Sequence, residues 1–317
     1  MPTPGITVFT PAFNRAHTLG RVFDSLVRQH STLFEWLVVD DGSTDETTTV
    51  LADAIRIAPF NVRVVKQPNG GKHRAHNTAI QHARGELTVI LDSDDELAPG
   101  AIEAIWEEWS AIPSGERNTF AGILAHSIDE SGSIVGAAFP RSPMDGKYFD
   151  LVASNVMIGE KLPCYRTDVL RRFPFPELAH SNAYVPEGVI WVEIGKTYKL
   201  RCVNRSLRVY HRDAADKTAI MNRYAAPESN SWGRMRFLQA ILNLGQADAR
   251  RFPVLFAKAA AGYVRYGLHS GYSIDRQGKA LESRTARALW LAAIPLGCAA
   301  FLFDRARRRS SGAHSAD

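Results

Sequence analysis

Acidic side chains stand in two short clusters in the first third of the chain, each directly after an apolar run. The five residues are Asp40, Asp41, Asp92, Asp94 and Asp95. Several carboxylates held close together repel one another unless a cation or hydrogen-bond donors join them. Taken singly, each cluster could be turn and helix-cap chemistry, which uses the same residue types. Two such clusters together favour a site for a divalent metal that prefers oxygen ligands, magnesium or manganese.

A glycine-rich stretch with basic side chains lies between the two acidic clusters. Residues 69–77 read Asn-Gly-Gly-Lys-His-Arg-Ala-His-Asn, which combines backbone freedom with cations suited to a diphosphate. The chain has neither a GxxxxGK[ST] loop nor a GxGxxG turn after its first apolar run, which argues against ATP and NAD. A glycine turn with solvated basic side chains is the simpler alternative for this stretch alone.

The elements that must position these residues alternate between strand and helix over residues 5–110. Strands are predicted at residues 6–10, 35–40, 62–65 and 87–91, and a helix is predicted at 75–83. Ser43 and Glu46 have the spacing of a capping box, which predicts another helix start there. This pattern indicates βαβ units with a parallel sheet, and ligands bind such sheets at the carboxyl ends of the strands. Both acidic clusters fall at those ends.

After residue 110 the pattern changes. Residues 120–126 and 133–138 flank an Asp-Glu-Ser-Gly turn and predict a hairpin, and a late strand is expected within 200–210. Residues 232–244 and 254–268 read as helices with apolar faces.

The bulk properties are those of a globular protein. The 317 residues carry a net charge of +5, with the basic excess in the C-terminal tail, which suits an anionic surface better than nucleic acid. Three cysteines far apart in sequence predict free thiols in a reducing compartment. No basic-then-apolar leader opens the chain, so we expect a cytoplasmic protein, associated with the inner face of the cell membrane.

The basis for that membrane association is an apolar segment at residues 289–303. It is apolar on every side but contains Pro295 and Gly297, and at about 15 residues it is shorter than the roughly 20 that span a bilayer. A re-entrant or interfacial anchor is therefore predicted, with its arginine-rich flank facing anionic lipid. A buried terminal helix or a dimer interface is the alternative.

Four motifs in order resemble those of the family 2 glycosyltransferases of GT-A fold, mostly bacterial inverting enzymes. The resemblance runs from Thr7 to about Ala101 and is looser beyond. The motifs are Thr10-Pro11-Ala12-Phe13-Asn14-Arg15, Val38-Val39-Asp40-Asp41-Gly42-Ser43-Thr44-Asp45, Asn69-Gly70-Gly71 with Asn77, and Asp92-Ser93-Asp94-Asp95.

The resemblance implies an α/β fold of GT-A type, a mixed, mainly parallel sheet flanked by helices, followed by a helical C-terminal region. It places Thr10, Pro11 and Asp40 beside the nucleotide base, normally uracil, Asp92 near the ribose, and Asp94 on the metal. The remaining residues predicted to bind the donor are Asn14, Gly71, Lys72 and Asn77.

Two candidates come from the looser second half. Glu187, in Pro-Glu-Gly-Val-Ile-Trp, stands where such enzymes place a catalytic carboxylate, often in a Glu-Asp pair, although glycine follows it here. Glu177 and Glu193 are weaker competitors. His211 resembles the late histidine that many GT-A enzymes bring to the metal, but a lone histidine after a strand is often structural.

The sequence thus predicts a metal-dependent glycosyltransferase. Its donor would be a nucleotide sugar, normally a UDP-sugar, and its acceptor a saccharide or a lipid-linked molecule. Transfer would invert the anomeric carbon and serve the synthesis of a cell-surface polysaccharide or glycolipid. The predicted domains are residues 1–215 (donor half to about 115, acceptor half from 116), 216–284 and 285–317. The rivals are a sugar-phosphate nucleotidyltransferase, which would carry a glycine-rich loop after the first strand, and a non-catalytic nucleotide-sugar-binding or membrane scaffold subunit.

Overall fold

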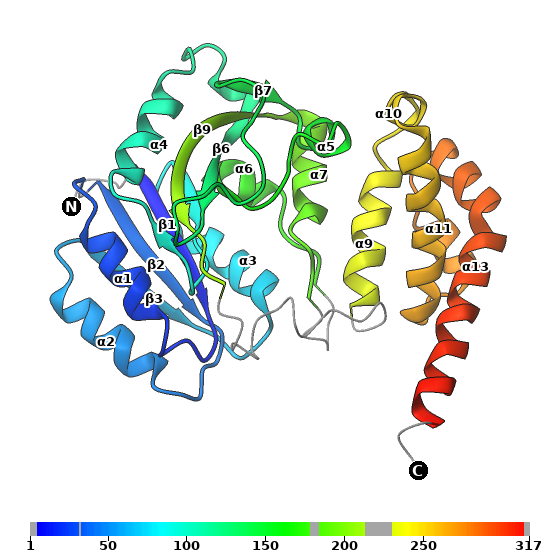
Figure 1. The fold of residues 1–317 in the computed structure, drawn as a ribbon, viewed down its shortest axis with the longest axis horizontal. Coiled ribbons are helices and arrows are strands. Elements are labelled where there is room, and N and C mark those ends of the chain that lie inside the picture. The colour runs from blue at the N-terminus through cyan, green and yellow to red at the C-terminus, as the bar shows by residue number, and fades with distance from the viewer. Residues whose placement is uncertain (1–4, 32, 178–183, 213–229, 314–317) are drawn as a thin grey trace. The chain divides into compact units, whose positions relative to one another are not determined.

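The computed structural model describes all residues except 1–4, 32, 178–183, 213–229 and 314–317 (Figure 1). The chain divides into two compact units. The first contains Met1–Asn182 and Glu193–Ala215, and the second contains Ala183–Val192 and Asp216–Asp317. Each unit is described by itself.

A nine-stranded mixed sheet forms the first unit, in the order β3-β2-β1-β4-β8-β6-β9-β5, with β7 paired to β9. Strands β3, β2, β1 and β4 are parallel, and β8 runs antiparallel to both β4 and β6. The strands are β1 Ile6–Ala12, β2 Phe34–Asp40, β3 Asn61–Lys66, β4 Leu87–Ile90, β5 Glu96–Leu97, β6 Phe120–Ile128, β7 Met144–Gly146, β8 Lys161–Arg166 and β9 Lys199–Val209. The predicted parallel sheet is confirmed.

Helices α1, α2, α3, α4 and α6 pack against this sheet through buried apolar side chains. In α1, Leu19, Val22 and Leu26 recur at helical spacing and are completely buried, and they join a core that contains Trp36 of β2. The helices of the first unit are α1 Leu19–Val27, α2 Thr47–Ile57, α3 Lys72–His82, α4 Ala101–Ser110, α5 Tyr148–Ala153 and α6 Thr167–Arg172, and α7 Gly188–Thr197 is divided between the two units.

Two local predictions in the first unit are wrong. The helix after β2 begins at Thr47, not at a Ser43 cap, because the Ser43 hydroxyl accepts the Asn14 amide and Asp45 accepts the amide of Thr47. The hairpin after residue 120 keeps its turn, which Asp129 closes, but its second strand is reduced to a single bridge between Ile128 and Ile134.

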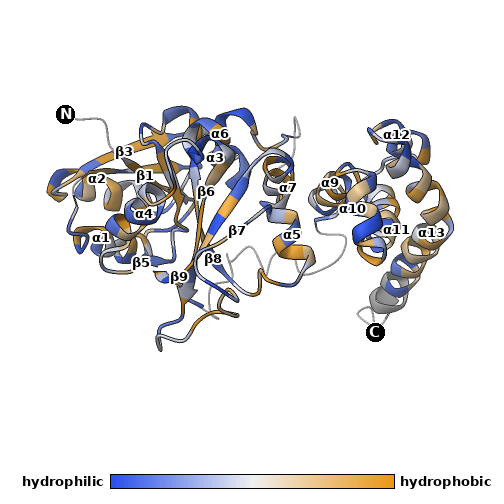
Figure 2. Cartoon of the chain, turned by 90° about the horizontal axis from the view of Figure 1, so that it is seen from above, coloured by the Kyte–Doolittle hydropathy of each residue, from blue (hydrophilic) through white to orange (hydrophobic). Residues whose placement is uncertain are grey.

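The second unit is helical, as the sequence predicts. Its helices are α9 Ser231–Leu242, α10 Gln246–Arg251, α11 Pro253–His269, α12 Ile274–Lys279 and α13 Arg284–Ala313. The expectation of a short broken segment at 289–303 is wrong, because α13 continues through Pro295 as one helix. Its stretch Arg284–Arg307, 24 residues, is long and apolar enough to cross a membrane. Figure 2 shows the hydrophobic residues along this helix.

Candidate functional site

The loops after three neighbouring parallel strands meet at one edge of the sheet. Strand β1 lies between β2 and β4, and Ala12 at its end is in register with Asp40 at the end of β2. Asp92 follows β4 by two residues. The structure therefore brings both acidic clusters to the carboxyl edge of the sheet, where parallel α/β proteins bind ligands.

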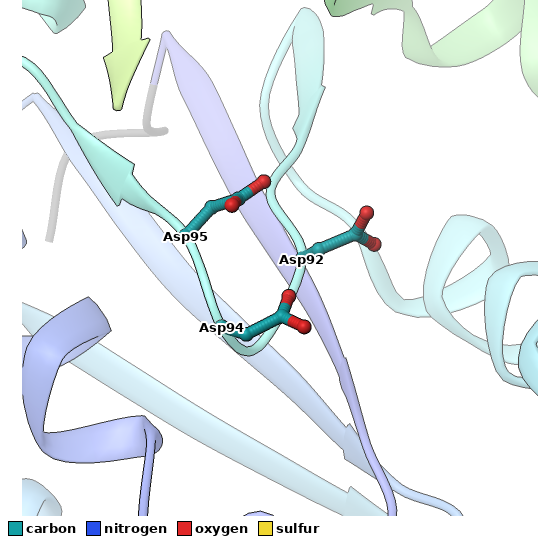
Figure 3. A group of neighbouring side chains, drawn as sticks. All are labelled: Asp92, Asp94 and Asp95. Atoms are coloured by element: carbon teal, nitrogen blue, oxygen red, sulfur yellow. The ribbon is translucent and has the colours of Figure 1, made fainter. Parts of the chain in front are cut away.

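The second cluster is one tight turn that carries three carboxylates. Oxygen atoms of Asp92, Asp94 and Asp95 lie within 4.8 Å of one another, and those of Asp92 and Asp94 point to the same side (Figure 3). The Asp95 amide donates to the Asp92 carbonyl at 3.2 Å, and the Arg21 guanidinium donates to the Asp94 carbonyl at 2.8 Å. These bonds hold the turn and leave the Asp94 carboxylate on its rim.

The carboxylates of Asp92 and Asp94 differ in their electrostatic environment. Desolvation would raise the pKa of Asp92, although 34% of its side chain is exposed, but the Lys72 ammonium at 2.6 Å holds that pKa below its usual value. Burial and the neighbouring charge of Asp92 raise the pKa of Asp94. Asp94 is thus a carboxylate that an added cation would stabilise in its ionised form.

Asp95 faces inward onto Arg208 of β9, a residue that sequence reasoning missed. The Arg208 guanidinium is buried, lies 3.3 Å from Asp95, and donates to Ser127 and Glu160 at 2.8 and 3.2 Å. Burial raises the pKa of Asp95 to about 7, with Arg208 opposing and the other two aspartates adding to the rise. The only sequence signal was an arginine inside the apolar run Leu-Arg-Val of a strand.

The first cluster has a different partner set. The Asp41 carboxylate is buried and accepts the backbone amides of Gly70 and Gly71 at 2.9 and 2.7 Å, as well as the Gln67 amide group at 2.6 Å. Gly71 has a φ of 89°, a conformation that favours glycine. Asp41 therefore shapes the glycine loop, and this loop delivers Lys72, the first residue of α3, to Asp92.

Four residues predicted to contact the donor make loop and core contacts. The Thr10 hydroxyl is buried and accepts the Trp36 indole N–H at 3.0 Å, and Pro11 follows Thr10 within β1. The Asn14 side chain accepts the Thr44 amide at 2.8 Å, and Asp40 accepts the Ser43 amide at 2.9 Å. Their contact with the donor stays a prediction.

Asn77 of α3 is used to hold a segment that is distant in sequence. Its amide group accepts from the Phe175 amide at 2.8 Å and donates to the Phe175 carbonyl and the Glu177 carboxylate at 3.0 and 2.7 Å. Glu177 also lies 3.5 Å from the Arg74 guanidinium. The donor-binding role of Asn77 remains a prediction.

His211 lies beside the acid turn but is held by glutamates. Its amide donates to Asp95 at 3.1 Å, its Nε2 is 2.9 Å from Glu96, and its Nδ1 contacts Glu130. Among the described side chains, the group that could hold a metal consists of the three aspartates without His211. Metal ligation by His211 stays a prediction.

Glu187 belongs to the second unit. It precedes α7, and its carbonyl accepts the amides of Ile190 and Trp191 at 3.1 and 3.2 Å. Its competitor Glu193 forms an ion pair with Lys196 at 2.7 Å. The assignment of Glu187 as the base stays a prediction.

A cavity of about 430 Å³ lies elsewhere in the first unit. Glu86, just before β4, and Arg166, at the end of β8, line it together with Trp109 and Arg171. Arg171 donates to the carbonyls of Ile80 and Ala83, at 3.1 and 2.6 Å. The cavity is at the amino end of β4, away from the acidic edge, and its arginines serve the fold.

Comparisons with known proteins agree with this geometry. The family described as glycosyl transferase family 2 matches residues 7–116, which contain both acidic clusters and the glycine loop. This part of the chain matches glycosyltransferase family 2, and the protein is a glycosyltransferase. A relative in Campylobacter jejuni, GalNAc(5)-diNAcBac-PP-undecaprenol beta-1,3-glucosyltransferase, is 28% identical over 232 residues, 70% of each chain. Pasteurella multocida chondroitin synthase is 37% identical over 106 residues, 33% of this chain and 11% of that one.

Solved structures show that this glycosyltransferase has the GT-A fold. S. aureus TarS 1-349 in complex with UDP-GlcNAc superposes with a TM-score of 0.63 at 17% identity, covering 96% of this chain and 92% of that one. Mannosyltransferase PcManGT from Pyrobaculum calidifontis in complex with GDP-Man and Mn2+ gives 0.51 at 20% identity, covering 95% and 88%. The predicted fold class is confirmed.

Proposed function

We propose that this glycosyltransferase transfers a sugar from a UDP-sugar to a hydroxyl of a saccharide or lipid-linked acceptor, with inversion at the anomeric carbon. The observation that carries the proposal is the Asp92–Asp95 turn at the carboxyl edge of the sheet, with Lys72 at 2.6 Å from Asp92. A UDP-GlcNAc complex of a protein with the same fold and a lipid-linked acceptor in the name of a relative support the choice of donor and acceptor.

The acid turn fits a magnesium or manganese ion. Three carboxylates within 4.8 Å offer the hard oxygen ligands that such ions prefer, and an added cation would favour the ionised form of Asp94, whose pKa is raised. We assign Asp94 to the metal, with Asp92 between the metal and the ribose. A bound divalent ion would neutralise the donor phosphates and the negative charge that grows on the leaving diphosphate.

The residues of the chain would then perform a single displacement. Lys72, already at the rim of the acid turn, would exchange its contact with Asp92 for a phosphate oxygen of the donor. Glu187 would accept the proton of the acceptor hydroxyl while that oxygen forms its bond to the anomeric carbon. The bond from the anomeric carbon to the diphosphate oxygen breaks in the same step.

We further propose that the protein works at the inner face of the cell membrane. In this assignment residues 1–215 hold the donor and acceptor sites, residues 216–284 belong to the C-terminal region, and residues 285–317 contact the membrane. The apolar length of α13 supports the last assignment.

Mass spectrometry of the products tests the proposed reaction. The protein is incubated with membrane extract and a panel of nucleotide sugars, with manganese or with a chelator. We expect one UDP-sugar to yield a glycosylated product only when metal is present. Products that carry a nucleotide instead would show a nucleotidyltransferase, and the absence of product with every donor would favour the scaffold alternative.

The catalytic base is tested by Glu187→Gln, which keeps the size of the side chain and removes its basicity. General-base assistance is worth about a hundred- to ten-thousand-fold in rate, so turnover should fall by that factor while UDP-sugar affinity stays within a few fold. The melting temperature is measured beside turnover. Near-normal turnover of folded Glu187→Gln would show that Glu187 is not the base and would leave Glu177 or Glu193 as the candidates.

A further inference from the structure

Helix α13 has two faces of different character, and one of them is fixed within the second unit. Ala286, Trp290 and Gly297 are buried on the packed face. At Gly297 the helix approaches α11 so closely that an added Cβ would lie 2.4 Å from the Cβ of Val264. This contact sets the rotation of α13 and therefore determines which side chains face outward.

The outward face is an apolar stripe about four turns long. At the angular spacing of a helix, its residues fall on one side of the helix. We define the stripe as Ala288, Leu291, Leu296, Ala299, Leu302 and Phe303, all exposed. Leu296 and Phe303 are 66% and 67% exposed, unusual values for large apolar side chains.

Positive charge flanks the stripe at both ends. Arg284 and Arg287 precede it, Arg305 and Arg307 follow it, and all four are exposed. Within the described side chains of α13, the one carboxylate is that of Asp304, and it is turned away from solvent. Arg265 of α11 holds both of its oxygens at 2.6 Å, and His269 is 2.8 Å away.

We propose that α13 lies flat on an anionic lipid surface, with the apolar stripe at the boundary of the acyl chains and the four arginines among the headgroups. Large exposed apolar side chains with cations beside them are the composition of interfacial helices. This inference rests on the membrane contact proposed above and is independent of the transfer reaction.

Two observations argue against a helix that crosses the bilayer, although its length would allow it. Lys258 is exposed on α11, one turn from Ala261, whose carbonyl lies against Gly297 near the middle of α13. A crossing α13 would bring this ammonium and the Arg265–Asp304 pair into the hydrocarbon, where charged groups are costly. A flat helix leaves both on the water side.

A paired copy of this chain fits the stripe less well than lipid does. In a two-fold interface the same surface meets itself, so arginines at either end of one stripe would face arginines of the other. No exposed acid on the described part of α13 would offset that repulsion. Anionic headgroups supply the missing negative charge.

Vesicle flotation tests the lipid surface with the full chain. We expect binding to vesicles of phosphatidylcholine with phosphatidylglycerol, and about tenfold weaker binding to phosphatidylcholine alone or in high salt. Leu302→Glu should reduce binding about tenfold or more. The matched control is Ile57→Glu in α2, since Ile57 is 57% exposed and Leu302 is 61% exposed. UDP affinity of both variants is measured in parallel and should be unchanged, so failure of this inference is separable from failure of the donor site.

Depth measurements distinguish a flat helix from a crossing one. Spin labels are placed by Ala288→Cys, Leu296→Cys or Phe303→Cys in a Cys298→Ala background, in which Cys164 and Cys202 are buried. The outer two positions are about 22 Å apart along the axis. Equal depths at all three are expected. Depths that increase steadily along the helix would overturn the proposal. It would also be overturned if the wild type were a dimer that Leu302→Glu dissociates, while the variant bound vesicles as tightly as the wild type.

Discussion

The two acidic loops at the sheet edge use the same residue type but balance its charge in different ways. After β2, the Asp41 carboxylate accepts backbone amides of Gly70 and Gly71. After β4, Asp92 and Asp95 lie against the side-chain cations of Lys72 and Arg208. Backbone amides cannot leave without unfolding the loop, whereas a lysine can move to a phosphate. The first loop therefore builds the edge, and the second is suited to bind a ligand there.

The largest loss of stability is expected when Arg208, the cation of the second loop, is replaced. Arg208→Met leaves the Asp95 carboxyl buried without its cation, and removal of one partner of a buried ion pair costs about 3–5 kcal/mol. We expect the free energy of unfolding to fall by that amount in urea titrations. The double variant Asp95→Asn/Arg208→Met should recover part of the loss, because no acid is then left without a partner. Equal stability of wild type and Arg208→Met would remove Arg208 from the support of the turn.

The next largest effect is expected at Asp41. Asp41→Asn replaces one of two accepting oxygens by an NH2 group, so at least one of the bonds from Gly70, Gly71 and Gln67 is lost. The free energy of unfolding should fall by about 2–3 kcal/mol. The control Asp53→Asn, at an exposed acid paired with Arg56, should change it by less than about 0.5 kcal/mol. Similar small effects in both variants would mean that Asp41 does not hold the glycine loop.

A smaller effect on stability is expected at His76 of α3, the helix that carries Lys72. Burial, with the nearby charge of Lys72, lowers the pKa of His76 to about 3, against about 6.5 for an unfolded histidine. Below pH 6.5 the unfolded chain binds a proton that the folded chain excludes, so stability decreases as the pH falls toward 3. Between pH 7 and pH 5, wild type should lose about 2 kcal/mol more than His76→Phe. Equal losses in urea unfolding at the two pH values would show that His76 titrates normally.

The sequence was sufficient for the strands and the acidic edge because the evidence for them is local. Continuous apolar runs such as residues 36–39 predict buried parallel strands, and each run ends where its acid begins. The start of α2 was missed because Ser43 bonds to Asn14, on another loop, instead of capping the helix. The pattern gave no information on that distant partner.

Roles that depend on distant contacts could not be predicted. Asn77 and Phe175 are far apart in sequence and meet only in the folded protein, and Arg208 reaches Asp95 because β9 pairs with β5. Pro295 suggested a break in α13, yet a helix can pass through a proline when its packing on a neighbour compensates for the lost hydrogen bond. Packing on α11 at Gly297 meets that condition.

We expect Asp94 to join the donor to the protein through a divalent metal, and titration calorimetry with UDP tests this role directly. Wild-type protein should bind UDP at least about tenfold more tightly with manganese than with a chelator. Asp94→Asn should bind UDP with one low affinity in both conditions, with an unchanged melting temperature, while Asp53→Asn behaves as wild type. An Asp94→Asn variant that keeps the full gain in affinity from manganese would show that Asp94 does not hold the metal.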